Sequence, residues 1–151
     1  MRRAGGFTFV EMVVVVAILA ILASLVLPAG RFVLRRSKEA ELRQHLRILR
    51  NAIDEYKRYS DAGLIQVEQG TDGYPAELEL LVEGVEIVGL PDKKVRFLRR
   101  IPVDPMTGEA EWGLRSYQDE PDSDGWGGEN VYDVYCLSEG TSLSGEPYST
   151  W

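Results

Sequence analysis

A single carboxylate, Glu11, interrupts an apolar stretch that carries no other charge between Phe7 and Leu27. As a helix this stretch would be about 30 Å long, which matches the thickness of the hydrocarbon core of a bilayer. A carboxylate is costly in that environment unless it is paired, and an ionisable residue there indicates a function. Glu11 is therefore expected to have a cationic partner.

The rest of the sequence offers few groups for catalysis. It contains one histidine, His45, and one cysteine, Cys136, and no serine in a nucleophile-elbow pattern. Because no set of nucleophile, base and orienting residue emerges, the sequence predicts that the chain is not an enzyme. We interpret His45 as a partly exposed helix residue and Cys136 as a small buried residue of a strand. The net charge of -7 argues against nucleic acid as a partner, since phosphate contacts require a basic surface.

Three interpretations of the apolar segment compete: a signal peptide, a plain membrane anchor, and a prepilin-type leader followed by its helix. A signal peptide would have a shorter apolar run, and the small residues at 20–24 lie inside the helix. A plain anchor explains the hydrophobicity but not Glu11. Charge counting alone would place the C-terminal flank in the cytoplasm, because basic residues follow the segment. These are Arg31, Arg35, Arg36 and Lys38.

The third interpretation rests on Gly6-Phe7 followed by Thr8 and Glu11, which resembles the cleavage motif of type IV prepilins. The resemblance implies that a prepilin peptidase cuts between Gly6 and Phe7 and methylates the new N-terminus at Phe7. It also implies a cytoplasmic leader and an exported body, opposite to the charge count. Glu11 would then neutralise the N-terminal amine of a neighbouring subunit, and pairing would remove much of the cost of both charges in hydrocarbon.

The same helix is predicted to continue as an amphipathic helix to Tyr59. Apolar residues recur at spacings of four, three, four and three, which places them on one stripe of a helix. They are Leu42, Leu46, Leu49, Ile53 and Tyr56. We expect this stripe to be covered by the sheet of the same domain. Pro28 removes one backbone hydrogen bond, so we expect either a functional kink there or a harmless one.

After Tyr59 the pattern changes to short elements. Asp61-Ala62-Gly63 predicts the end of the helix, and glycines at 70 and 73 predict a loop. The remaining expectations are a short helix at 76–82, a connector at 97–104, a turn at 104–108, strands at 109–117 and 130–137, and a tail at 144–151. The tail is expected to form either a third strand or a loop.

The body carries Tyr74-Pro75, a Pro-x-Asp-Pro turn at 102–105, a Tyr-Asp-x-Tyr segment at 132–135, and Trp151. In these features it resembles the major pseudopilin of type II secretion systems. The resemblance implies calcium in the C-terminal loop, where Glu139 and Glu146 are the candidate ligands and Pro147 stands at the next acidic position. Calcium takes about six to eight oxygens, and this loop offers only two carboxylates. A second acidic loop, 122–129, is interpreted as a solvated turn.

The sequence therefore predicts an α+β fold. A long N-terminal helix, transmembrane in its first half and amphipathic in its second, packs on a small C-terminal antiparallel sheet. The expected divisions are a leader at 1–6, a transmembrane helix at 7–30, the amphipathic half of the same helix at 31–60, and a periplasmic domain at 61–151.

The resemblance implies a structural subunit of a periplasmic pseudopilus filament in type II secretion, held by one helix in the bacterial inner membrane. Its partners would be copies of itself in a helical filament, minor pseudopilins, the prepilin peptidase and the inner-membrane assembly platform. Two alternatives stay open. One is a subunit of a type IV pilus surface fibre, which usually carries a cysteine pair that this chain lacks. The other is a membrane-tethered periplasmic binding module, which would need a ligand cleft.

Overall fold

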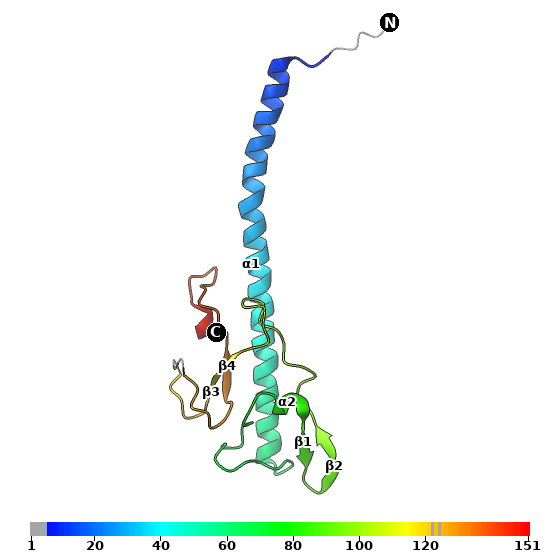
Figure 1. Cartoon of the computed structure of the whole chain (residues 1–151), viewed down its shortest axis with the longest axis vertical. Coiled ribbons are helices and arrows are strands. Elements are labelled where there is room, and N and C mark those ends of the chain that lie inside the picture. Colours follow the sequence, from blue (N-terminus) through cyan, green and yellow to red (C-terminus); the bar gives the residue numbers. More distant parts are fainter. Residues whose placement is uncertain (1–5, 122, 124) are drawn as a thin grey trace. The chain divides into compact units, whose positions relative to one another are not determined.

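The computed structural model describes residues 6–121, 123 and 125–151, of which 25–29 and 91 are described by their backbone alone. The chain divides into two compact units, Met1–Ser37 and Lys38–Trp151. The division falls within one 53-residue helix, α1 (Phe9–Asp61). The other elements all belong to the second unit (Figure 1).

In the first unit, α1 exposes apolar side chains all around its axis. Every side chain that is described between residue 6 and Ser37 is exposed, and Phe9 reaches 84%. Within the described part of the chain, no helix has the length and hydrophobicity required of a membrane span. Pro28 lies within α1, but its side chain is outside the described part. The transmembrane segment and the kink at Pro28 therefore stay predictions.

Helix α1 ends at Asp61, where the sequence predicts it to end. The Gly63 N–H donates to the Ser60 carbonyl at 2.9 Å, and the Leu64 N–H donates to the Tyr59 carbonyl at 3.0 Å. This pair of bonds is a Schellman motif, which requires a left-handed residue just after the helix. Gly63 has a φ of 67° and meets that need without a Cβ penalty.

The predicted apolar stripe forms the centre of the core of the second unit. All five stripe residues are buried, with at most 3% of each side chain exposed. They pack in one cluster with residues from the later segments, including Leu81, Trp112 and Val134. The stripe therefore covers its own domain, as expected.

The sheet differs from the single one that we expected. The described residues form two separate two-stranded antiparallel sheets. In the first, β1 (Val85–Ile87) pairs with β2 (Leu90–Val95), and a bridge from Ile65 to Ile87 holds this hairpin beside the end of α1 (Figure 1). In the second, β3 (Gly113–Arg115) pairs with β4 (Asp133–Tyr135). The α+β class and the antiparallel pairing are confirmed, but the single sheet is wrong.

The smaller elements agree with the sequence in kind more than in extent. The short helix is α2 (Leu80–Glu83), which begins four residues later than predicted. The turn at 104–108 is confirmed by a bond of 2.8 Å from the Gly108 N–H to the Asp104 carbonyl. The tail forms a short 3-10 helix, η1 (Tyr148–Thr150), so it takes the loop alternative and not the strand.

Cys136 is fully buried, as predicted, but it follows β4 directly and does not belong to a strand. Burial, helped by the neighbouring carboxyl of Asp104, raises the pKa of its thiol to about 12. Asp104 is itself fully buried, and its Oδ1 accepts from the Met106 N–H at 2.7 Å. Its Oδ2 has no hydrogen-bond partner elsewhere in the described part of the chain.

Gly113 in β3 is covered by the ring of Tyr135, its partner across the sheet. A Cβ at Gly113 would collide with that ring. The Arg115 guanidinium lies 4.2 Å from the centroid of the same ring. We expect Gly113→Ala to lower the free energy of unfolding by about 1–3 kcal/mol, because the ring must move. Urea unfolding of the detergent-solubilised chain measures this change.

The matched control is Gly125→Ala, where the nearest atom to a new Cβ is the Ser123 hydroxyl at 4.0 Å. We expect this control to unfold like the unmodified chain. Equal stabilities of the two variants would contradict the predicted collision at Gly113.

Candidate functional site

The N-terminal motif forms a reciprocal cap on α1. The helix begins at Phe9, so Thr8 is the N-cap residue and Glu11 is the third residue of the helix. The Thr8 hydroxyl oxygen accepts from the Glu11 N–H at 3.3 Å, and Glu11 Oε2 accepts from the Thr8 N–H at 3.2 Å. The Thr8 hydroxyl also donates to Glu11 Oε2 at 3.3 Å. This arrangement is a capping box, which satisfies N–H groups that a helix start leaves open.

Gly6 and Phe7 precede this cap outside the helix. The Phe7 side chain is 77% exposed, and exposed, non-helical segments are where proteolysis concentrates. Residues 1–5 of the predicted leader lie outside the described residues. The peptide bond between Gly6 and Phe7 is thus placed where a peptidase could reach it, two residues before the helix begins.

Residues 1–27 match a family model described as the prokaryotic N-terminal methylation motif. The chain carries a type IV pilin-like signal. This signal implies processing by a prepilin peptidase and assembly into a filament, and it is typical of structural proteins. It spans Gly6, Phe7 and Glu11, and it does not distinguish a secretion pseudopilus from a pilus. Comparisons with curated proteins and with solved structures found no match.

The C-terminal loop that carries the two candidate calcium ligands folds back on itself. The Ser142 N–H donates to the Glu146 carbonyl at 2.7 Å, and the Tyr148 N–H donates to the Gly140 carbonyl at 3.0 Å. The loop therefore folds back with Glu146 opposite Ser142, and both Glu139 and Glu146 are exposed. In the described part of the chain, no three His, Cys, Asp or Glu side chains gather as a metal site would require.

Calcium binding at Glu139 and Glu146 therefore stays a prediction from the sequence. Asp122 and Asp124 of the second acidic loop lie outside the described residues. Thermal melting with and without excess calcium tests both loops. An unchanged melting temperature would contradict calcium at either one.

A buried carboxylate that the sequence analysis missed ties the C-terminal loop to α1. Glu39 is only 4% exposed. Its Oε1 accepts from the Leu143 N–H at 2.7 Å and from the Tyr148 hydroxyl at 3.0 Å. Glu39 stands three residues before Leu42 and so continues the apolar stripe. A charged residue at a stripe position was the signal that could have found it, because buried charges require partners.

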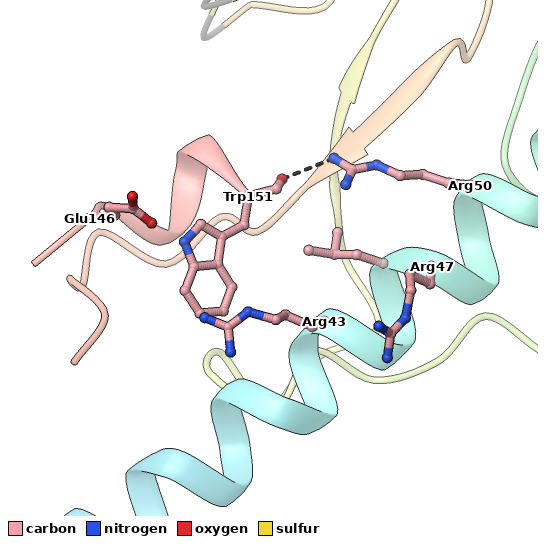
Figure 2. A pocket seen from close by; sticks show the side chains of 6 residues that line it. Arg43, Arg47, Arg50, Glu146 and Trp151 are labelled. Carbon is pink, nitrogen blue, oxygen red and sulfur yellow. Dashed lines mark hydrogen bonds between the residues drawn. The ribbon is translucent and has the colours of Figure 1, made fainter. Parts of the chain in front are cut away.

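Two arginines of α1 also contact the C-terminal segment, at Trp151 (Figure 2). Arg50 donates from Nε to Asp133 Oδ1 at 2.6 Å, and from Nη2 to the Trp151 oxygen at 3.0 Å. The Arg43 guanidinium lies 3.9 Å from the centroid of the Trp151 ring, which is a cation–π contact. Trp151 is thus fixed by its backbone and by its ring.

His45 ties the connector at 97–104 to α1. It is half-buried, and its Nδ1 donates to the Val103 carbonyl at 2.8 Å. The interpretation as a partly exposed helix residue is confirmed, and the bond to the connector is an addition to it.

Asp119 orders the acidic loop between β3 and β4. Its Oδ2 accepts from the Ser116 N–H at 2.7 Å and from the Gly127 N–H at 3.0 Å. These bonds favour the charged carboxylate and hold the pKa of Asp119 below its usual value. Because the folded pKa is lowered, their contribution is fully present above about pH 4. It is lost as the pH falls through the lower pKa of the folded state.

We therefore expect the loop to loosen in that acidic range. Trp126 reports it, since its indole N–H donates to the Asn130 carbonyl at 2.8 Å within the same loop. Its fluorescence should change as the pH falls below about 4. Asp119→Asn keeps an acceptor oxygen but cannot titrate, so this change should be absent in that variant. The same change in both proteins would contradict the role of Asp119.

Proposed function

We propose that the chain is a membrane-anchored subunit of a pilin-like filament, cut between Gly6 and Phe7 and methylated at Phe7. The match of residues 1–27 to the N-terminal methylation motif carries this proposal. The apolar side chains exposed all around the first unit support it. Such a surface requires cover, which a bilayer supplies before assembly and neighbouring helices supply in a filament.

Glu11 of one copy would neutralise the amine of Phe7 on the next copy. In a single chain the Glu11 carboxylate is already bonded to Thr8. The local cap therefore keeps the charge satisfied until the stronger, cationic partner arrives. Because an unpaired charge is costly in apolar surroundings, this pairing favours one axial register between copies.

We further propose that the filament is a pseudopilus of type II secretion, with the second unit in the periplasm and with minor pseudopilins and an inner-membrane platform as partners. The segments at 74–75, 102–105 and 132–135 and Trp151 support this assignment by resemblance. A surface pilus is the alternative. The absence of a cysteine pair favours the pseudopilus, since Cys136 is the only thiol in the sequence.

The test is N-terminal sequencing and intact-mass measurement of the membrane-extracted protein, expressed with and without a prepilin peptidase. The proposal predicts a mature chain that starts at methylated Phe7 only when the peptidase is present. Gly6→Leu is the matched control and should stay uncut. A chain that still begins at Met1, or one cut near Ala23, would overturn the filament function.

A further inference from the structure

A cleft of about 330 Å³ lies between α1 and the C-terminal segment of the second unit. Its lining residues are Arg43, Leu46, Arg47, Arg50, Glu146 and Trp151. The lining therefore contains three arginines and one glutamate in a chain whose net charge is -7. We call this the arginine cleft (Figure 2).

The three arginines of the cleft differ in what already holds them. Arg50 is bound to Asp133 and to the Trp151 oxygen, and Arg43 is stacked on the Trp151 ring. Arg47 is exposed, and no hydrogen bond or ion pair joins it to any residue in the described part of the chain. Arg50 is thus paired with the Asp133 carboxylate, Arg43 is held against the Trp151 ring, and Arg47 is left for a partner.

The chemistry of the cleft selects an acidic partner. Guanidinium groups bind carboxylates through paired, charge-assisted hydrogen bonds. The same chain carries such groups in the loop between β3 and β4, where Glu120 and Glu129 are exposed and have no partner among the described residues. This loop supplies none of the residues that line the cleft of its own chain. A second copy is therefore the partner with matching charge.

We propose that the arginine cleft of one copy binds Glu120 or Glu129, on the β3–β4 loop of a neighbouring copy. This inference rests on the proposed function, since it assumes that copies assemble. The contact joins two different surfaces of the chain, so it is heterologous and repeats from copy to copy into an open filament. Arg47 would bind Glu120 or Glu129, and the fixed Arg43 would add long-range attraction.

Charge reversal in the full-length chain tests the contact. Arg47→Glu should reduce the yield of sheared filaments about fivefold or more, because carboxylates would then face each other at every copy. Filament yield is measured by electron microscopy and sedimentation. The matched control is Arg58→Glu, an exposed arginine on α1 outside the cleft, which should leave the yield unchanged. Melting curves check that every variant folds.

The decisive experiment exchanges the charges of the two proposed partners. Arg47→Glu combined with Glu120→Arg or with Glu129→Arg should restore filaments, although each single change impairs them. Normal filaments from Arg47→Glu, or a loss that neither swap restores, would overturn the acidic-loop contact and leave the filament function standing. The latter result would indicate another anionic partner for the cleft. Absence of filaments from the unmodified, correctly cut chain would overturn both proposals.

Discussion

Replacing Glu39 with alanine should lower the free energy of unfolding of the second unit by about 2–4 kcal/mol. The change removes the acceptor of two donors, the part-buried Leu143 N–H and the buried Tyr148 hydroxyl. A buried donor left without a partner loses its hydration and gains nothing in return. The loop that carries η1 should therefore detach from α1 before the rest of the core unfolds.

Urea unfolding, followed by tryptophan fluorescence in detergent, measures this loss. Two variants control it. Glu39→Gln keeps an acceptor oxygen and should be clearly milder than alanine, and Glu41→Ala removes an exposed carboxylate two residues away and should change little. If Glu39→Ala unfolds like Glu41→Ala, the buried carboxylate does not hold the loop.

The second large effect is expected at Glu11, on assembly and not on stability. Glu11→Ala should be cut normally between Gly6 and Phe7, because the peptide bond lies outside the helix, but it should form no filaments. Without Glu11, each added copy would bring one unpaired ammonium group into apolar surroundings, at a cost of several kcal/mol. Intact mass reports the cleavage, and electron microscopy reports the filaments.

Glu11→Gln separates the two roles of this residue. The amide oxygen can still cap the Thr8 N–H, but the side chain has no charge for the neighbouring amine. We expect Glu11→Gln to fail in assembly as alanine does. Normal filaments from the glutamine variant would mean that the cap matters and the ion pair does not.

The features that the sequence predicted correctly depend on residues that are close together in the chain. The motif at Gly6, Phe7 and Glu11 spans six positions, so it is readable without a fold. The apolar stripe of α1 follows the helical period over many turns. The helix end at Asp61 follows from Gly63, whose left-handed conformation is a local requirement.

The parts that it missed depend on contacts between distant segments. Arg50 and Asp133 are 83 positions apart, and Glu39 and Leu143 are 104 positions apart, so no local sequence pattern predicts either contact. The β1–β2 hairpin was missed for a different reason. Pro91, Lys93 and Lys94 interrupt the alternation of apolar and polar residues that is typical of a strand. The predicted strands were too long, because pairing with a neighbouring segment, and not intrinsic propensity, decides where a strand ends.

The single thiol of the chain is unreactive in the folded state. Burial raises the pKa of Cys136 to about 12, so the thiol stays protonated at neutral pH. Because only the thiolate attacks a disulfide, buried copies of this residue do not exchange with one another. A filament of this chain would therefore be held by non-covalent contacts alone even under oxidising conditions, and each subunit could return from it unchanged.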